Sequence, residues 1–562
     1  MTVSLRLGPL LRHVAPTSAT VWVETDAPCR ARILVDGREA ASARTFTVHG
    51  HHYAVCELTD LRPGARLPYE VLLDDTPVWP EPDSPLPPSV VRTPAPDAPT
   101  RLLYGSCHTA TGDSPEGLVR HGPDMLRATA RRLAREPVEG NLLLLLIGDQ
   151  VYADEVQEPV RELLRRARED DPADGAPDDE VVRYGEYAEL YRQAWSDPQV
   201  RWLLSTVPTL MVFDDHDIRD DWNTSAAWRR AMDARPWWHA RITSGLGAYW
   251  VYQHLGNLSP ADRDADPVWN RIRDHGSDAG EVLDAFAWRA HDEPSSYRWS
   301  HRFDAGAVRV LVTDTRCGRA LGGDGEPERS ILGPDGHAWL DEHLTGGHEH
   351  VVVASTVPVL LPPAVQHLEA WNEAVCEGAW GGWARGPAER LRQALDLEHW
   401  GAFQRSFRRL GEGVRALCRG ERGRAPATVL FLSGDVHFSY LARTDVAEDA
   451  PPTGLRDGTG PEGRRTRVAQ LVSSPLCNQL PLSLRRSARL SASWPLAAAG
   501  RVLTWLARVP RPWLRWRLDG PLYFGNTIGE VVFDGPDAEA VWYHCPEAGQ
   551  DAPPRVHRRV NL

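Results

Sequence analysis

The stretch Leu142–Asp154, LLLLLIGDQVYAD, places an uninterrupted apolar run directly before Gly148 and Asp149. An apolar run of this length that ends at glycine is typical of a β-strand buried on both faces of a sheet. Open α/β sheets bind their ligands at the carboxyl ends of such strands, which is where we expect Asp149. A carboxylate buried there needs a positive partner, because an unpaired buried charge is costly. The alternative is that Asp149 caps the helix that follows, and this stretch alone does not decide between the two.

The composition is that of a globular protein. The chain has 562 residues, of which 42% are hydrophobic and 25% charged, and its length suggests roughly two to four domains. The net charge of −14 argues against a nucleic acid as a structural partner, because binding to its phosphates needs clustered positive charge. All 63 basic residues are arginine, and the forked guanidinium group of arginine suits phosphate.

The cysteines and the first residues bear on the compartment. The 8 cysteines are scattered and form no CxxC pair, which indicates free thiols and a reducing compartment. The chain does not open on a basic segment followed by a long apolar one, and no apolar run approaches about 18 residues. We therefore expect neither a signal peptide nor a transmembrane segment, and a cytoplasmic location.

Two parts of the chain differ in their patterns. Residues 1–95 contain short alternating segments separated by Asp, Gly and Pro turns, which predicts a small, fibronectin III-like β-sandwich domain. Residues 81–100 are rich in proline and predict a linker. From Arg101 onward strand-like runs alternate with helix-like segments, so we expect an α/β sandwich with a mixed sheet over residues 96–545. The first domain is expected to pack beside the second, and binding of carbohydrate or of another protein is the alternative.

Residues 482–518 stand apart, with eight arginines, four tryptophans and no acidic residue. One interpretation is an amphipathic segment that makes weak contact with an anionic membrane surface. The other is a helix whose tryptophans pack on the domain and whose arginines face solvent. We favour the second interpretation.

Four predicted strand ends carry side chains that can bind metal ions: Ser106-Cys107-His108, Asp149 with Tyr152, Asp214–Asp217, and Asp435 with His437. Parallel strands bring their carboxyl ends to one edge, so these ends would crowd carboxylates into one crevice. Carboxylates so near one another cannot all stay ionised unless cations are bound between them. Two metal ions about 3.5–4 Å apart would supply the positive charge that is needed. Taken singly, each has an ordinary explanation. Cys107 could be a small core side chain, His437 an ordinary core histidine, and Asp214 and Asp215 a helix cap with its solvated neighbour.

Taken together, these segments resemble the alkaline phosphatase D (PhoD-like) family of the metallophosphatase superfamily. The resemblance rests on LLYGSCH, IGDQVYAD, FDDHDIRDDWN, SGDVHFS and LVSSPLCNQLP, in that order within residues 101–545. It implies a metallophosphatase-type β-sandwich core flanked by helices (αββα) and preceded by the small all-β sandwich. It also implies a metal-dependent phosphoric ester hydrolase, of the alkaline phosphatase or phosphodiesterase type, that acts on a phosphate-ester substrate.

The resemblance also assigns residues. It implies that ferric iron is held by Cys107, Asp149, Tyr152 and His437. Asp149 would bridge to a second site with Asp215 and Asp435, for calcium, magnesium or manganese, and His216 would be the catalytic histidine. The donor chemistry agrees, because thiolate and phenolate beside carboxylate suit Fe3+, whereas oxygen donors suit hard divalent ions.

Other residues of these segments keep two interpretations. Arg316, at the end of RVLVTDTR, is a candidate to grip a phosphate oxygen, and a structural ion pair is the alternative. The sequence does not decide which of Asp214, Asp217 and Asn223 reach the metals. Asn478 is a candidate pocket residue, and His108 either supports the metal ligands or belongs to the loop.

Three other functions fit parts of the pattern. The first is a phosphodiesterase acting on phospholipid at a membrane surface, or on a cyclic nucleotide. The second is a zinc-dependent amide hydrolase, against which the oxygen-rich ligand set argues. The third is a non-catalytic interaction protein with the metallophosphatase fold, against which the complete set of metal motifs argues. Preference for mono- or diesters and the oligomeric state have no signal in the sequence.

Overall fold

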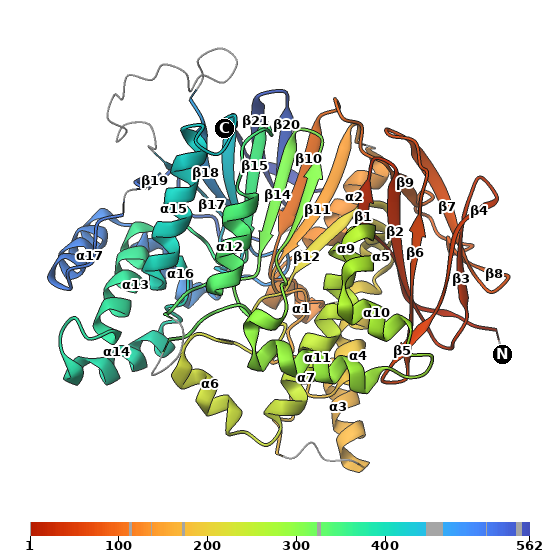
Figure 1. The fold of residues 1–562 in the computed structure, drawn as a ribbon, viewed down its shortest axis with the longest axis horizontal. Helices are drawn as coiled ribbons and strands as arrows, with labels where there is room; N and C mark the ends of the chain where they lie inside the picture. The colour runs from red at the N-terminus through yellow and green to blue at the C-terminus, as the bar shows by residue number, and fades with distance from the viewer. Residues whose placement is uncertain are drawn as a thin grey trace.

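Two mixed β-sheets stacked face to face form the centre of the protein (Figure 1). The computed structural model describes residues 2–111, 115–136, 138–170, 175–322, 328–444, 465–512, 514–546 and 553–562. The first central sheet has the strand order β12-β11-β10-β20-β21-β22. Its strands are β10 (Thr100–Gly105), β11 (Asn141–Ile147), β12 (Thr209–Val212), β20 (Ile528–Asp534), β21 (Asp537–His544) and β22 (Arg555–Asn561). β10, β11 and β12 run parallel, and the remaining pairs of this sheet are antiparallel.

The second central sheet has the order β13-β14-β15-β16-β18-β17-β19. Its strands are β13 (His301–Ala305), β14 (Val308–Thr313), β15 (His350–Ser355), β16 (Thr428–Ser433), β17 (Tyr440–Thr444), β18 (Arg467–Val472) and β19 (Trp516–Leu518). β14, β15, β16 and β18 run parallel. The sheets therefore each contribute a block of parallel strands whose carboxyl ends can face one site.

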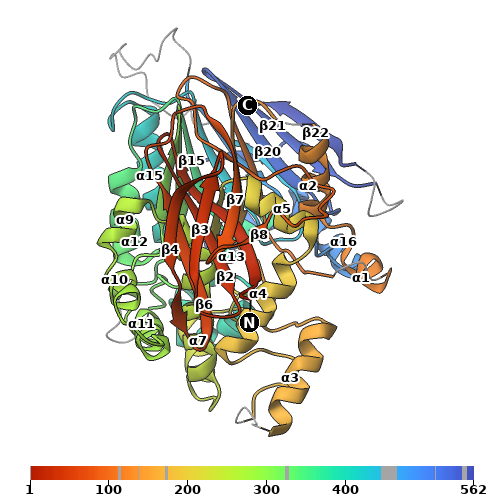
Figure 2. The same ribbon diagram turned by 90° about the vertical axis from the view of Figure 1, so that its right-hand side faces the viewer.

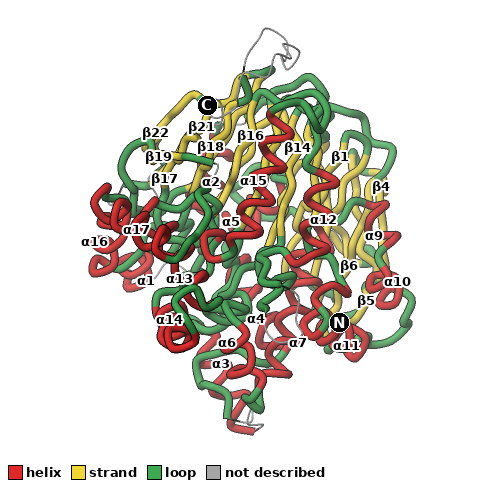
Figure 3. Tube along the Cα trace, turned by 60° about the vertical axis from the view of Figure 1, so that its left-hand side comes forward, coloured by secondary structure: helices red, strands yellow, loops and turns green. Residues whose placement is uncertain are grey.

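Successive side chains of these strands point to opposite faces of the sheet, and both faces are buried. On β15, Val352 and Ala354 join the core between the two sheets, whereas Val351 and Val353 join a second core against α12 and α15. Figure 3 shows both helices on the outer face of this sheet. α2 and α5 pack into the core on the outer side of the first sheet (Figure 2). The result is the predicted four-layer αββα sandwich, and the apolar run 142–147 is its fully buried strand β11.

The helices surround these sheets and lie mainly in the connections that follow the strands. Their bounds are α1 (Pro115–His121), α2 (Met125–Arg135), α3 (Glu158–Asp170), α4 (Tyr184–Trp195), α5 (Pro198–Thr206), α6 (Ala226–Asp233), α7 (Trp238–Tyr249), α8 (Leu255–Asn257), α9 (Pro260–Ala265), α10 (Pro267–Arg273), α11 (Gly280–Asp292), α12 (Gly333–His343), α13 (Pro363–Cys376), α14 (Gly382–Ala394), α15 (Gln404–Cys418), α16 (Leu482–Ser491) and α17 (Trp494–Leu506). Among the described residues, no helix has both the length and the apolar character needed to cross a bilayer. All eight cysteines are free thiols, as their scatter predicts.

The first 92 residues build a separate sandwich of two antiparallel sheets, with orders β1-β2-β6-β5 and β4-β3-β7-β8, and with β9 on β7. The strands are β1 (Leu5–Ala15), β2 (Ser18–Thr25), β3 (Arg30–Val35), β4 (Arg38–Arg44), β5 (Phe46–Val48), β6 (His51–Leu58), β7 (Arg66–Leu73), β8 (Thr76–Trp79) and β9 (Val90–Arg92). The two sheets share one core, and Trp22 and Tyr53 pack against Tyr252 of the central part. The sandwich is thus fixed to the central layers by buried aromatic contacts.

Three expectations about the chain's segments need correction. The predicted linker 81–100 contains β9. Its backbone pairs with β7, and the side chains of Val90 and Val91 are buried. The central sheet extends beyond residue 545, since β22 adds an edge strand. In 482–518, Trp494 and Trp505 do not pack on the domain. Trp516 does, as predicted, since its ring lies against Phe407 and its Nε1 donates to the Leu361 carbonyl oxygen at 2.8 Å. α17 buries its small residues Ala497, Gly500 and Thr504 instead, and Trp513 lies outside the described residues.

Two glycines let strand ends approach each other, one within the first sheet and one between the two sheets. Gly148 follows β11 with a φ of +91°, and a Cβ there would lie 2.8 Å from the Cβ of Asp214. Gly434 follows β16, and a Cβ there would lie 2.0 Å from the Oγ of Ser106, in the loop after β10. Real Cβ atoms do not come this close, so only glycine permits these contacts.

Replacing Gly434 by alanine should therefore destabilise the protein. The added methyl group must displace the Ser106 loop, and such overpacking costs about 1–3 kcal/mol in the free energy of unfolding. Urea unfolding measures it. The matched control is Gly382→Ala at the start of α14, where a Cβ meets nothing within 4 Å and a change within about 0.5 kcal/mol is expected. Equal midpoints for Gly434→Ala and the wild type would contradict the close approach of the sheets.

Candidate metal centre

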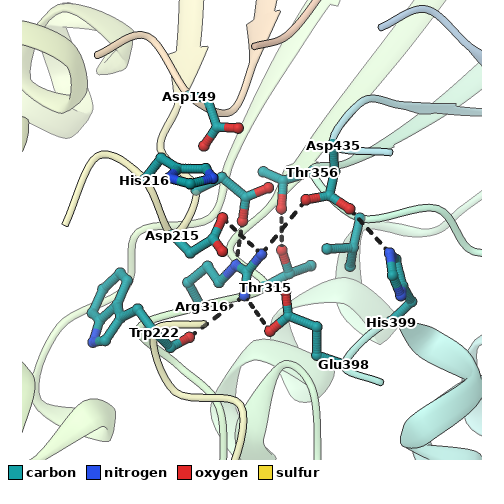
Figure 4. Close-up of polar contacts among 12 residues, drawn as sticks. Asp149, Asp215, His216, Trp222, Thr315, Arg316, Thr356, Glu398, His399 and Asp435 are labelled. Atoms are coloured by element: carbon teal, nitrogen blue, oxygen red, sulfur yellow. Dashed lines mark hydrogen bonds and ion pairs between the residues drawn. The ribbon is translucent and has the colours of Figure 1, made fainter. Parts of the chain in front are cut away.

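The carboxyl ends of β10, β11, β16 and the segment after β12 bring the predicted site residues together. They surround a cavity of about 1100 Å³ whose lining includes Asp149, Tyr152, Asp215, His216, Asp435 and His437. Cys107 and Arg316 lie beneath the lining and are fully buried. The cavity thus lies where open α/β sheets bind ligands, and Figure 4 shows its floor around Arg316.

The backbone bends sharply at each strand end. The φ angles of Cys107, Asp149, Asp435 and His437 are +57°, +44°, +68° and +55°. Left-handed backbone is uncommon for residues other than glycine, and a cluster of such residues is typical of functional sites. These turns bring the side chains of Cys107, Asp149 and His437 together, whereas the Asp435 carboxylate lies against His399 and Arg316.

Cys107, Asp149 and His437 form the first candidate metal group, with one donor atom from each lying within 4.8 Å of the others. The Cys107 Sγ lies 3.3 Å from Asp149 Oδ2. Among the described residues, Asp149 Oδ1 and the Tyr152 hydroxyl are buried without a hydrogen-bond partner of good geometry. Buried polar atoms are normally satisfied, so the unpaired oxygens point to a ligand at this place.

The electrostatics of this group also favour a cation. Burial raises the pKa of Cys107 to about 12. Burial and the neighbouring Cys107 raise the pKa values of Tyr152 and Asp149 well above their ordinary values. Burial lowers the pKa of His437 to about 4, which leaves a neutral imidazole. A neutral imidazole can ligate as it is, and a bound cation would reverse the shifts of the other three by stabilising their anionic forms.

Asp149 also belongs to a second candidate group, with Asp214 and Asp215. Asp214 Oδ2 is a further buried oxygen with no hydrogen-bond partner among the described residues. Burial raises the pKa of Asp214 to about 8, although Arg316 opposes the shift. A third group of Asp215, His216 and Asp220 lies nearer the cavity mouth. Asp149 is the residue that the first two groups share.

Arg316 occupies the floor of the site. Its guanidinium pairs with Asp214 and Glu398, lies 3.0 Å from Asp215 Oδ1 and lies 3.7 Å from Asp435 Oδ1. Figure 4 shows Asp215, Glu398 and Asp435 around this guanidinium. These contacts are those of the ion-pair alternative. With its side chain fully buried, Arg316 does not face the space where a phosphate would bind.

His216 is held by Asp154, the last residue of the stretch 142–154. Its Nδ1 lies 3.0 Å from Asp154 Oδ1, and its ring packs on Tyr152 with 4.6 Å between the centroids. Burial alone would lower the pKa of His216, but Asp154 raises it well above its ordinary value. The Nε2 atom is 3.6 Å from Asp220. Asp154 therefore fixes the ring through Nδ1 and leaves Nε2 on the cavity side.

A second histidine, His399, supports the site through Asp435 and has no signal in the sequence. His399 Nε2 lies 3.0 Å from Asp435 Oδ2, and its Nδ1 lies 2.6 Å from Oε1 of the buried Glu369. Burial alone would lower the pKa of His399, but Glu369 raises it well above its ordinary value. No motif marks these residues, because Glu369 lies on α13 and His399 in a distant loop. Asp154, by contrast, stands in the quoted stretch and could have been found from its spacing to Asp149.

The structure separates the remaining candidates. Asp217 turns away from the cavity, where it accepts hydrogen bonds from the Asp214 amide and from Gln253. Asn223 donates to the carbonyl oxygen of Arg316 at 3.1 Å and supports that loop. Asn478 lines the cavity. His108 lies 2.9 Å from Asp124, the residue that caps α2, so its contact supports the loop.

Two stacked mixed sheets with acidic, histidine and cysteine donors gathered at parallel strand ends define a metallophosphatase-type hydrolase. A sequence model described as PhoD-like phosphatase matches residues 128–476, and the chain belongs to that family. The protein is accordingly a metal-dependent phosphoesterase. A domain of unknown function (DUF7800) matches residues 2–91.

One solved structure supports this fold, and a second match is weaker. The structure of PhoD is similar with a TM-score of 0.60 and 12% sequence identity, over 100% of this chain and 90% of that one. A purple acid phosphatase, PPD1, from yellow lupin (Lupinus luteus) seeds matches with a TM-score of 0.46 and 10% identity, over 98% of this chain and 73% of that one. No curated protein matches the chain.

The raised carboxyl pKa values predict how stability depends on pH. Burial raises the pKa of Asp214 to about 8, and burial with the nearby Glu398 raises that of Asp221 to about 9. A carboxyl with a raised folded pKa stabilises the fold below its unfolded pKa and loses this as pH rises through the folded value. Between the unfolded pKa of about 4 and the folded pKa, metal-free protein should therefore lose about 1.4 kcal/mol of free energy of unfolding per carboxyl and pH unit. The loss should end near pH 8 for Asp214 and near pH 9 for Asp221.

Urea unfolding with a chelator and with added metal ions measures this slope. Bound cations keep the carboxylates ionised and stabilise the fold, so the metal-loaded protein should show a smaller slope. Asp214→Asn removes one titrating group and should flatten the slope of the metal-free protein. Equal slopes with and without chelator would contradict a cation at these carboxylates.

Proposed function

We propose that the cavity hydrolyses phosphate esters with two metal ions that share Asp149. The ligands of the first ion would be Cys107, Asp149, Tyr152 and His437, and those of the second Asp149, Asp215 and Asp435. The observation that carries this is the position of Asp149 in two candidate groups, one with Cys107 and His437 and one with Asp214 and Asp215, with one buried oxygen left unpaired. Asp435 belongs to neither group, and its place in the second set rests on the contact that it shares with Asp215 at the Arg316 guanidinium. A single carboxylate between two donor clusters is the arrangement that a bridged two-metal centre needs.

The donor sets support different ions at the two positions. Thiolate, phenolate and imidazole around one carboxylate suit ferric iron, and the oxygen-only second set suits calcium, magnesium or manganese. When bound, such ions supply Lewis acidity at the phosphoryl oxygens and lower the pKa of a water molecule. We assign Fe3+ to the Cys107 and Tyr152 position and Ca2+, Mg2+ or Mn2+ to the other.

The protein's own groups then have distinct roles. His216 carries a proton on its ring because Asp154 holds the other nitrogen, and its Nε2 can give that proton to the leaving oxygen of the ester. His399 and Arg316 orient Asp435 and Asp215 from opposite sides, so that ligand positions are set before the substrate arrives. Arg316 thus acts on the carboxylates and makes no contact with the phosphate.

Phosphodiesters and phosphomonoesters both fit the chemistry of this centre. The cavity is wide, at about 1100 Å³, and its mouth carries apolar as well as charged side chains, which favours esters with an organic group. The non-catalytic alternative is disfavoured by the complete donor set and by the position of His216, which lines the cavity while Asp154 holds its Nδ1.

Asp149→Ala and His216→Ala should fail in different ways. Asp149→Ala removes the shared ligand, so metal content and hydrolysis of a soluble aryl phosphate should fall together. His216→Ala leaves the ligands intact, so metal content should stay while kcat falls by roughly 10²–10⁴-fold, the usual contribution of a general acid. Metal analysis and steady-state kinetics on both variants provide the measurement. A fully active Asp149→Ala variant would refute the shared-ligand assignment.

If Tyr152 binds ferric iron, the iron-loaded protein should be coloured. A phenolate bound to ferric iron absorbs visible light by charge transfer, so iron-loaded protein should show a visible band. Tyr152→Phe should lose this band while most of the iron stays bound to the remaining donors. Visible spectra recorded at equal iron content make the comparison. An iron-loaded wild type without such a band would show that Tyr152 is not a ligand.

A further inference from the structure

The helices α16 and α17 carry the most exposed apolar surface of the described chain. Trp494, Trp505 and Leu482 are 80%, 73% and 76% exposed. Further exposed apolar side chains on the same two helices are Leu484, Leu490, Leu496, Val502 and Leu506. We call residues 482–506 the Arg/Trp platform. Contiguous exposed apolar surface of this kind marks a site of interaction.

α17 has the opposite pattern to an ordinary surface helix. Its buried side consists of the small residues Ala497, Gly500 and Thr504, and it packs closely on α13, where a Cβ at Gly500 would lie 2.7 Å from the Cβ of His367. Trp494, Val502 and Trp505 are exposed nonetheless, and Val502 and Trp505 border a groove between α17 and α13. A surface helix normally turns its apolar side inward, so this outward apolar side needs a partner.

The platform is also positively charged against the charge of the whole protein. Arg486, Arg489 and Arg501 are exposed, and none of the three pairs with a carboxylate of a described residue. No acidic residue occurs within 482–518 although the net charge of the protein is −14. The partner that complements apolar side chains flanked by unpaired arginines is an anionic surface with an apolar interior.

The platform adjoins the mouth of the metal cavity. Leu482, Leu484 and Arg485 of α16 line that cavity, together with Val119 of α1 on another side. Figures 1 and 3 show α16 and α17 together at one end of the molecule. Whatever binds the platform is therefore held beside the entrance to the catalytic groups.

We propose that the Arg/Trp platform docks the protein on the surface of an anionic lipid bilayer, with the cavity mouth next to the headgroups. α17 has 13 residues, or about 20 Å of helix, which is too short to cross a hydrocarbon core of about 30 Å. It can lie in the interface, where tryptophan is favoured and arginine reaches the lipid phosphates. The inference deepens the proposed function, because it selects esters held at a membrane surface.

Co-sedimentation with vesicles tests the docking. Wild-type protein should bind vesicles of phosphatidylcholine mixed with phosphatidylglycerol more tightly than vesicles of phosphatidylcholine alone, and salt should weaken the binding. Trp494→Ser with Trp505→Ser should abolish most of the binding. Arg486→Gln with Arg501→Gln should weaken binding to the anionic vesicles by roughly tenfold or more.

The matched control is Arg165→Gln with Arg166→Gln on α3. These arginines are also exposed, at 53% and 75%, and α3 lies far from α17 (Figure 1). This control changes the net charge equally and should bind vesicles like the wild type. All variants should keep the wild-type rate on a soluble aryl phosphate. That assay tests the catalytic proposal separately, since vesicle binding requires no hydrolysis.

Two results would overturn the docking. One is a wild type that stays in the supernatant with anionic vesicles, or a Trp494→Ser, Trp505→Ser variant that binds them as the wild type does. The other is a wild type that sediments as a dimer while this variant is a monomer, because the platform would then serve contact between two copies of the chain.

Discussion

One buried guanidinium shared by several buried carboxylates governs the central part of this protein. Arg316 lies among Asp214, Asp215, Glu398 and Asp435. Arg319 also pairs with Glu398 and His399 with Asp435, but these groups leave Asp149 without an ion pair among the described residues. Burying such groups is tolerable only when each charge has a partner. The carboxylates that Arg316 leaves uncompensated, Asp149 above all, therefore require cations from outside the chain. Without metal ions the site lacks the positive charge that its carboxylates need, and its proposed function depends on the ions that supply this charge.

The stacking of two sheets is what concentrates the carboxylates. Asp149 and Asp215 come from the sheet that contains β11 and β12, whereas Asp435 and His437 follow β16 of the other sheet. Gly434 lets the strand ends of the two sheets approach to contact distance, and Gly148 does the same for the ends of β11 and β12 within the first sheet. Left-handed turns at the ligand positions then direct the side chains inward. Neither sheet alone presents both donor sets, so the metal centre depends on the packing of the whole sandwich.

Around this centre, supporting contacts and surface character serve two different purposes. The Asp154–His216 and Glu369–His399 pairs hold one nitrogen of each ring and point the other toward the site. They set orientation and protonation before a substrate binds, which saves reorganisation during reaction. The Arg/Trp platform, by contrast, lies outside the cavity and affects only what reaches its mouth. Hydrolysis thus depends on the cavity, whereas the proposed membrane contact depends on the Arg/Trp platform.

Much of the protein was determined by its sequence, because buried strands require apolar runs and metal donors require particular side chains. The run 142–147 specified β11, and the strand-end motifs specified the αββα fold and the residues that line one cavity. The tertiary structure alone decided the rest, because contacts between distant segments leave no local pattern. It placed Arg316 under the site, paired His399 of a loop with Glu369 of α13, and turned Trp494 and Trp505 outward. That last choice followed from the close fit of small residues on α17 against α13, which no periodicity in 482–518 could reveal.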